Sequence, residues 1–272
     1  MIRADPYTVK ALRWGARPHR RSIHCGPMAA RADAPHRAPL DKNSDAIREM
    51  FADVAPRYDL LNRLLSGRRD VAWRRAAARE LGLPAGARLL DLCCGTGDQA
   101  LALSAAGYRV TAGDFCLPML ARAEPKYAAA SGRRPRGLAA DTLRLPFTGG
   151  AFDGATVSFG LRNLADLDAG LAEIARCLRP GGRVAFLEFA LPRRRPLRAA
   201  YLFYFTRVLP WIGARLSPRA SAYRYLPESV LAFPQRDDLL ARMAAAGLGG
   251  GRWRDLTCGI VVLYDAEKEE RR

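Results

Sequence analysis

The chain has 272 residues and a net charge of +17, and 49% of its residues are hydrophobic and 26% charged. This composition is that of a globular protein, so wholesale disorder is excluded. The sequence has no run of about 18 apolar residues without a charge, so a transmembrane helix is not supported. The charge is uneven, because residues 1–40 carry +6 and residues 191–226 carry +8. A basic protein of this kind can meet nucleic acid or an anionic membrane.

Histidine and cysteine usage narrows the chemistry further. All three histidines lie within residues 1–40, so the rest of the chain offers none for a Ser-His-Asp triad or a His-ligated metal. We therefore expect no metal site. The six cysteines form no CxxC pair and are interpreted as reduced thiols. Residues 1–40 are predicted to be a basic, disordered leader, or a transit segment if the source is eukaryotic.

From residue 41 the chain shows regular periodicity. Residues 41–86 have helical spacing, interrupted near Pro56 and Gly67. Strands are then predicted over 88–92, 109–114, 136–141, 152–159 and 183–189, with two more around 252–256 and 259–264. A turn into a helix is predicted over 95–105, and helices are predicted over 118–130, 167–178 and 236–246. This alternation predicts an α/β fold with a doubly wound, mostly parallel sheet, which binds ligands beyond the carboxyl ends of its strands.

The alternation stops over residues 191–235. Eight of the 23 aromatic residues fall here, and residues 191–226 contain no acid. We predict that this segment is a helical insert after the fifth strand, and that it forms a lid over a substrate. The rest of the chain, residues 41–272, is predicted to be one catalytic domain.

A glycine loop follows the first predicted strand. Gly95 and Gly97 would let a ligand approach the backbone closely, and the helix after them offers free N–H groups. Gly95-x-Gly97-x-x-Ala100 also satisfies the GxGxxA pattern of dinucleotide binding, so a nicotinamide oxidoreductase is one alternative.

Three acids sharpen this interpretation. Asp91, Asp114 and Asp141 are expected at the ends of the first three strands. An acid before the glycines is unfavourable for a pyrophosphate, because like charges repel. It suits a cofactor with a cationic amino-acid portion, such as S-adenosyl-L-methionine. Asp114 can accept hydrogen bonds from ribose hydroxyls, and Asp141 can accept one from the adenine amino group.

Several segments resemble one known family, the quinone-biosynthesis C-methyltransferases, over about residues 45–265. They are Glu49-Met50-Phe51, residues 57–62, residues 91–98, residues 158–163, Leu187-Glu188-Phe189 and residues 223–229. The resemblance implies a class I S-adenosylmethionine-dependent methyltransferase fold with a Rossmann-like, seven-stranded sheet. Together with the glycine loop, it implies that the cofactor contacts Asp91, Gly95, Thr96, Gly97, Asp114, Asp141, Thr142 and Ser158. For Ser158, a strand-end cap is the alternative.

The implied reaction is methylation of a ring carbon of a polyprenylated quinol, which must be in its reduced form. Without histidine, the base would be Asp, Glu, Tyr or a water held by Arg162 and Asn163. We hypothesise that Arg162 and Asn163 orient the ring oxygen and stabilise phenolate charge, the alternative for Arg162 being a structural cap. Substrate contacts are expected from Tyr58, Tyr201, Tyr223 and Tyr225.

The tail of the quinol suggests where the protein works. Aromatic residues of the insert could line an apolar tunnel, while Arg193, Arg194, Arg195 and Arg198 face anionic lipid headgroups. We expect a cytoplasmic protein bound peripherally to the membrane, or a mitochondrial matrix protein in a eukaryote. The sequence leaves open whether the protein forms a homodimer. The main substrate prediction is demethylmenaquinol, giving menaquinol, with 2-methoxy-6-polyprenyl-1,4-benzoquinol of ubiquinone biosynthesis as the alternative.

Two other classes are considered. A nucleic-acid methyltransferase acting on base amino groups needs a polar-Pro-Pro-aromatic loop after the fourth strand, where this chain has Ser158-Phe159-Gly160-Leu161. We therefore expect no nucleic acid as partner. A non-enzymatic scaffold is disfavoured, because the glycines and the strand-end acids of a working cofactor site are all present.

Overall fold

The computed structural model describes residues 44–130, 132–208 and 221–270. The predicted leader, residues 1–40, lies outside them. The first helices are α1 (Ser44–Val54), the 3-10 turn η1 (Ala55–Arg57), α2 (Tyr58–Ser66) and α3 (Arg69–Glu80). Pro56 lies in the 3-10 turn, and Gly67 ends α2 in the left-handed conformation, with φ of 56°. Both breaks predicted from the sequence are confirmed.

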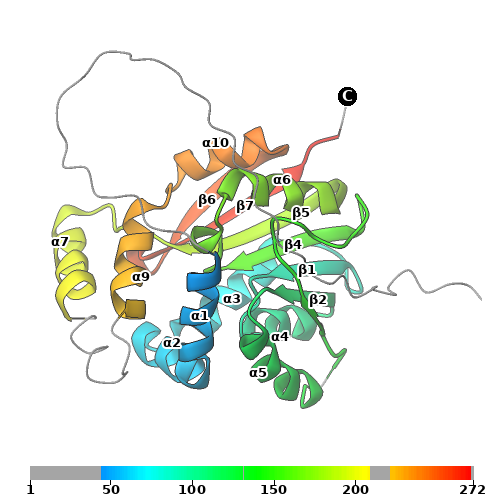
Figure 1. Cartoon of the computed structure of the whole chain (residues 1–272). Helices are drawn as coiled ribbons and strands as arrows, with labels where there is room; N and C mark the ends of the chain where they lie inside the picture. The colour runs from blue at the N-terminus through cyan, green and yellow to red at the C-terminus, as the bar shows by residue number, and fades with distance from the viewer. Residues whose placement is uncertain (1–43, 131, 209–220, 271–272) are drawn as a thin grey trace, which may run out of the picture. The chain divides into compact units, whose positions relative to one another are not determined.

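A seven-stranded sheet forms the centre of the fold (Figure 1). Its strands are β1 (Arg88–Leu92), β2 (Arg109–Asp114), β3 (Arg136–Ala139), β4 (Phe152–Ser158), β5 (Leu178–Phe189), β6 (Leu248–Leu256) and β7 (Val261–Lys268). Their order is β3-β2-β1-β4-β5-β7-β6, and only β7 runs antiparallel to its neighbours. The order reverses between β1 and β4, so a ligand site is expected at their carboxyl ends. The predicted α/β, mostly parallel, doubly wound sheet is confirmed.

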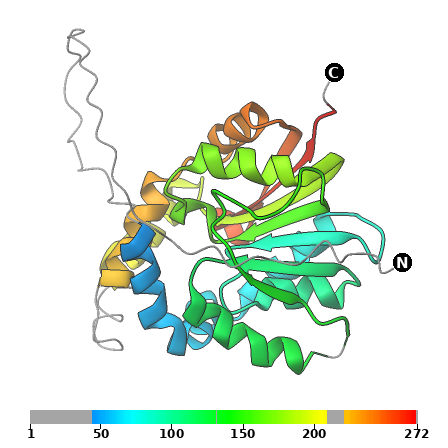
Figure 2. The ribbon, with the colours of Figure 1, turned by 45° about the vertical axis from the view of Figure 1, so that its right-hand side comes forward.

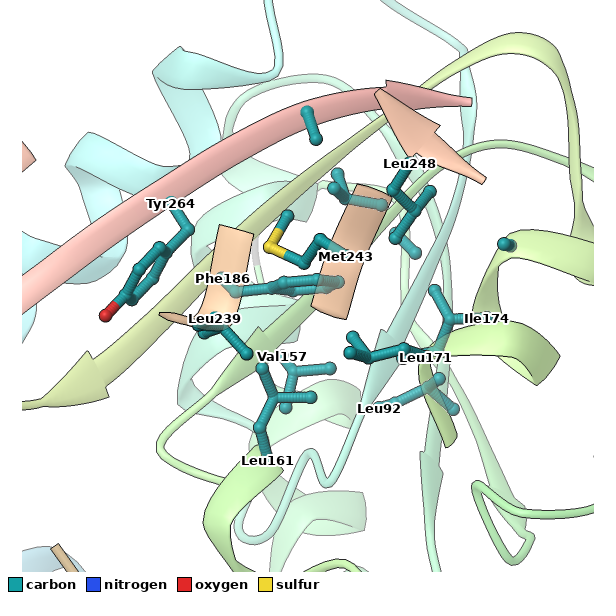
Figure 3. Close-up of a cluster of buried hydrophobic side chains, with 14 of the residues drawn as sticks. Leu92, Val157, Leu161, Leu171, Ile174, Phe186, Leu239, Met243, Leu248 and Tyr264 are labelled. Carbon is teal, nitrogen blue, oxygen red and sulfur yellow. The ribbon is translucent and has the colours of Figure 1, made fainter. Parts of the chain in front are cut away.

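Helices cover both faces of this sheet (Figure 2). The helices α6 (Leu167–Cys177) and α10 (Asp237–Ala245) pack on one face, and α3, α4 (Asp98–Ala105) and α5 (Leu117–Ala128) pack on the other. Figure 3 shows Phe186 of β5 among Leu171 and Ile174 of α6 and Met243 of α10. Burying each such side chain stabilises the folded state by about 1.5–3 kcal/mol relative to leaving it exposed. This core holds the strand ends in fixed positions.

Several strand boundaries differ from the sequence prediction: β6 begins at Leu248 rather than near 252, and β7 ends at Lys268 rather than near 264. The strand β3 ends at Ala139, so Asp141 is not its last residue; instead the Asp141 carboxylate accepts the Leu143 N–H at 2.9 Å in a tight turn. The strand β5 begins at Leu178 rather than at 183. Residues 180–182 therefore do not separate α6 from the strand, and they are accommodated by a register shift against β4.

The described part of the segment after β5 is mainly helical, as predicted. It contains α7 (Arg195–Phe203), a π-helical turn η3 (Tyr204–Val208) and α9 (Ser221–Ala232). The rings of Tyr201 and Phe205 stack with centroids 4.9 Å apart. The helix α9 contacts α1 and the 3-10 turn η2 (Leu161–Asn163), so the insert meets both the first helices and the end of β4. A last 3-10 turn, η4 (Thr257–Gly259), precedes β7.

The described cysteines are free, in agreement with the predicted reduced thiols. They are Cys93, Cys94, Cys116, Cys177 and Cys258, and Cys25 lies outside the described residues.

Candidate active site

The loop after β1 requires its glycines. Gly95 and Gly97 have φ of 54° and 85°, in the left-handed region that L side chains rarely adopt. A Cβ at Gly97 would also lie 2.5 Å from Cε1 of the Tyr127 ring. The Gly95 N–H points to the end of β2, where it donates to Asp114 Oδ2 at 2.8 Å. The loop therefore passes directly over the carboxyl ends of β1 and β2.

Asp91 is a fully buried carboxylate with one oxygen left over. Thr156 on the adjacent strand β4 donates its hydroxyl to Asp91 Oδ1 at 2.7 Å. Asp91 Oδ2 is buried and has no hydrogen-bond partner among the described residues. Burial raises the pKa of Asp91 to about 7. Since an unpaired buried oxygen is costly, the arrangement fits a ligand that brings a donor or a positive charge.

Asp114 is fixed at the end of β2 by backbone donors. Its two oxygens accept the N–H groups of Gly95 and Cys116, each at 2.8 Å. Burial raises its pKa, while these hydrogen bonds oppose the shift. Each carboxylate oxygen retains a second lone pair. Asp114 can therefore accept hydroxyl groups from a ligand without losing its own orientation.

The Thr96 hydroxyl is already bonded in this structure. It donates to Asp59 Oδ1 of α2 at 2.5 Å, and Asp59 Oδ2 accepts from Lys126 of α5 at 3.0 Å. Burial alone would raise the pKa of Asp59, but the hydrogen bonds from Thr96 and Lys126 lower it below its usual value. Lys126 also bonds Asp98 at the start of α4. This network ties the helices before the sheet to the glycine loop.

The remaining predicted cofactor residues lie at the same edge. Ser158 is buried at the end of β4, and its hydroxyl donates to Gln99 Oε1 at 3.2 Å. Thr142 is buried, with its hydroxyl 3.8 Å from the Cys93 sulfur. Asp141, by contrast, is exposed. Because it is exposed, the Asp141 carboxylate could meet a ligand only at the rim of the site.

Two adjoining cavities lie at this edge of the sheet. A small one of about 40 Å³ is lined by Gly95, Asp114, Ser158 and Asn163 among others. A large one of about 420 Å³ lies among α1, α2, α3, α7 and α9. The two share Phe51, Tyr58 and Phe159. The backbone of Phe159 has a φ of 63°, a strained conformation for an aromatic residue, which places its ring at the junction.

The walls of the large cavity are mostly apolar and aromatic. The Phe159 and Phe189 rings have centroids 4.5 Å apart, and Trp73 meets Phe159 edge-on at 6.0 Å. Further residues that line it are Leu61, Tyr201, Tyr204, Phe205, Leu226, Thr257 and Ile260. Such a surface suits a flat ring with a hydrocarbon substituent.

Arg162 and Asn163 lie where the two cavities meet. Arg162 is buried, and its Nη1 donates to Glu188 Oε2 at 2.9 Å and to the Phe159 carbonyl at 2.5 Å. Its Nε is buried without a partner among the described residues. Asn163 Oδ1 accepts the Tyr225 hydroxyl at 3.1 Å. Segments that are separated in the sequence thus meet at this point. Arg162 also forms a buried ion pair with Glu188, which is the structural role that the sequence left open as the alternative.

Three of the four predicted substrate tyrosines line the large cavity. These are Tyr58, Tyr201 and Tyr225. Burial raises the pKa of Tyr201 and Tyr225, so both are neutral hydroxyl donors at neutral pH. The side chain of Tyr223 lies outside the described residues.

The sequence interpretation missed several residues of the site. Asp59, Lys126 and Gln99 hold the cofactor loop, and Asp70 and Arg74 of α3 line the large cavity. No local signal distinguishes Asp70 from a solvent-facing acid in the first turn of a helix. In the structure α3 packs against α2 and β5, and Asp70 is buried beside the large cavity.

The strand order, the glycine loop after β1 and the acids at the strand ends are those of the S-adenosylmethionine-dependent methyltransferase fold. The structure of a SAM-dependent methyltransferase from Thermotoga maritima, described as a possible histamine N-methyltransferase, matches with a TM-score of 0.59 at 17% identity, covering 82% of this chain and all of that one. The phosphoethanolamine N-methyltransferase 2 of Haemonchus contortus matches with a TM-score of 0.55 at 14% identity, covering 73% and 53%.

Sequence comparison identifies the family. The profile of the ubiE/COQ5 methyltransferase family matches residues 40–268, and the chain belongs to that family. The demethylmenaquinone methyltransferase of Thermus thermophilus is 49% identical over 80% of this chain and 100% of its own length. That of Deinococcus radiodurans is 45% identical over 86% and 99%. A ubiquinone/menaquinone biosynthesis C-methyltransferase, UbiE, of Geotalea daltonii is 42% identical over 84% and 99%.

Proposed function

We propose that the protein transfers a methyl group from S-adenosylmethionine to a ring carbon of a polyprenylated quinol, and that demethylmenaquinol, which becomes menaquinol, is its substrate. The observation that carries this is the junction of the two cavities. A polar cavity lined by the Asp114 carboxylate adjoins, at Phe159, an apolar cavity of about 420 Å³. The names of the Thermus and Deinococcus relatives support the naphthoquinol ring over the benzoquinol ring.

The polar site has side chains suited to each part of S-adenosylmethionine. Asp91 Oδ2, buried and without a partner, would receive the cationic amino group. Asp114 would accept the ribose hydroxyls, and Asp141 and Thr142 would meet the adenine at the rim. Gly95 and Gly97 would let the ligand approach the backbone closely. The N–H groups at the start of α4 have no partner within the helix and could donate hydrogen bonds to it. When bound, the cofactor supplies an activated methyl group on a sulfonium.

The protein's own groups would hold the quinol ring and the charge that forms on it. Arg162 and Asn163 lie at the junction, where they can orient a ring oxygen and stabilise phenolate charge. Arg162 does not act as a base, because a guanidinium keeps its proton. The aromatic walls at Trp73, Phe159 and Phe189 hold the ring. Alignment of ring and methyl donor is the main catalytic contribution, since orientation alone can be worth several kcal/mol.

We also propose that the protein binds the surface of an anionic membrane. No helix among the described residues is long and apolar enough to span a bilayer. Two helices that line the large cavity carry exposed apolar side chains, Leu60 and Leu64 on α2 and Phe203 on α7, each more than 60% exposed. Four arginines are exposed here: Arg193 and Arg194 precede α7, and Arg195 and Arg198 lie in its first turn. Apolar and basic groups together favour an anionic lipid surface.

Quinone analysis in a complemented host tests the proposed function. We expect a host that lacks its own quinol C-methyltransferase to regain menaquinone, detected by mass spectrometry, when it expresses this protein. A Gly97→Val variant, whose side chain would occupy the space of Tyr127, should not restore it. Restoration of ubiquinone alone would contradict the naphthoquinol assignment, and restoration of neither would contradict the proposed function.

A binding measurement separates the oxidoreductase alternative. We expect S-adenosylhomocysteine to bind the purified protein in calorimetry and NAD not to bind. The opposite order would favour a nicotinamide enzyme.

A further inference from the structure

A buried carboxylate in the large cavity has only one of its two oxygens hydrogen-bonded by the described residues. Asp70, the second residue of α3, is 3% exposed and lines the cavity. Its Oδ1 accepts the Ser66 hydroxyl at 2.8 Å. Its Oδ2 is buried and has no hydrogen-bond partner among the described residues. A carboxylate oxygen left unpaired in a buried site is unfavourable unless a ligand completes it.

Asp70 is distinctive among the groups around it. It is the one acidic side chain among the described residues that line the large cavity. Arg74 lies one turn further along the same helix face, is also buried, and has an Nε without a partner in the described part of the chain. Its guanidinium lies 5.6 Å from the centroid of the Phe159 ring. An acceptor and a fixed positive charge thus flank the aromatic wall.

The other groups in reach of the cavity are poorly suited to take a proton. Glu188 is fully buried and ion-paired to Arg162. Tyr201 and Tyr225 are neutral, since burial raises the pKa of both. Histidine is confined to residues 1–40 of the sequence. Asp70 therefore combines a free acceptor oxygen with access to the cavity.

We propose that Asp70 is the general base of the reaction and that it takes the proton of a ring hydroxyl of the quinol. This inference rests on the proposed function. The ring O–H bond breaks and its proton moves to Asp70 Oδ2, leaving a phenolate whose charge Arg74 stabilises together with Arg162. The electron-rich ring carbon then forms the new bond to the methyl group, and the methyl–sulfur bond breaks with its electron pair remaining on sulfur. The methylated carbon finally loses its hydrogen as a proton to water, while Asp70 returns its proton to the ring oxygen. The balance is methylated quinol, S-adenosylhomocysteine and one released proton.

The test compares two variants at Asp70 with a matched control on the same helix. Asp70→Asn keeps the shape but cannot take a proton, and Asp70→Ala leaves space for a small exogenous base. Glu80→Gln, at the far end of α3, removes a carboxylate that pairs with Arg254 outside the cavity. Methyl transfer to reduced demethylmenaquinol is measured with each protein, with and without formate, and calorimetry with S-adenosylhomocysteine confirms that each variant is folded.

We expect Asp70→Asn to lower kcat by about 100-fold or more, the usual contribution of a general base, with unchanged affinity for S-adenosylhomocysteine. Formate should raise the rate of Asp70→Ala and leave the wild type and Glu80→Gln unaffected. Near-normal turnover by Asp70→Asn, or a defect in Asp70→Ala that formate does not relieve, would overturn the assignment. If Asp70→Asn does not fold, the formate response of Asp70→Ala decides. An inactive wild type would instead contradict the proposed function itself.

Discussion

At the scale of single residues, Asp91 links the cofactor site to pH. Burial raises its pKa to about 7, and a cationic amino group nearby would favour the ionised form. Binding should therefore weaken as the pH falls and the free protein takes up a proton. We expect the affinity for S-adenosylhomocysteine to be about fivefold lower at pH 6 than at pH 7, if Asp91 alone titrates.

Calorimetry at the two pH values measures this dependence, and the Asp91→Asn variant is the control. Asn cannot ionise, so the variant should bind weakly with an affinity that no longer follows pH over this range. An affinity of the wild-type protein that is constant between pH 6 and pH 7 would mean that Asp91 does not hold the amino group.

The Arg162–Glu188 pair separates folding from catalysis. Glu188 is fully buried, so Arg162→Met should leave an uncompensated charge and lower the free energy of unfolding by roughly 3–5 kcal/mol. The double variant Arg162→Met, Glu188→Leu should recover much of that stability, because both charges are removed. If Arg162 also stabilises phenolate charge, the double variant stays inactive. Urea unfolding and methyl-transfer assays on both proteins check this, and an active double variant would reduce Arg162 to a structural residue.

At the scale of elements, the network of Thr96, Asp59 and Lys126 joins α2 to the glycine loop and α5. Asp59→Ala removes the acceptor of both Thr96 and Lys126. We expect α2 to pack less firmly over the loop, and dissociation of S-adenosylhomocysteine to become several-fold faster in stopped-flow measurements. Asp45→Ala is the matched control, since Asp45 forms an exposed ion pair with Arg48 within α1. Equal rates in the two variants would show that the network does not retain the cofactor.

The sequence predicted the elements better than their contacts. Local periodicity and the breaks at Pro56 and Gly67 were sufficient for the helices and for most strand limits, because these depend on neighbouring residues. The turn at Asp141 was missed, since one side-chain hydrogen bond to Leu143 ends the strand early. Asp114 was predictable from its position after a strand, whereas Asp70 was not. Its burial depends on the packing of α3 against β5, a strand far along the chain.

At the scale of the whole molecule, the positive charge of the insert predicts that the protein binds anionic membranes. Changing Arg193, Arg194, Arg195 and Arg198 to Gln should abolish most flotation with vesicles that contain anionic lipid, because each basic group near such a surface contributes about 1 kcal/mol. The control changes four other exposed arginines to Gln, namely Arg79, Arg109, Arg122 and Arg133. It has the same net charge, so equal loss of flotation in both variants would indicate a general charge effect and not a surface formed by the insert.

The central claim is that the protein methylates a reduced quinol ring where its two cavities adjoin. The direct measurement is mass spectrometry of the product after purified protein is incubated with S-adenosylmethionine and demethylmenaquinol, in parallel with the oxidised quinone. We predict that the quinol gains one methyl group on a ring carbon and that the quinone, which has no hydroxyl proton to lose, gains none. A protein that binds S-adenosylhomocysteine yet leaves the quinol unchanged, or methylates its oxygen, would contradict the account.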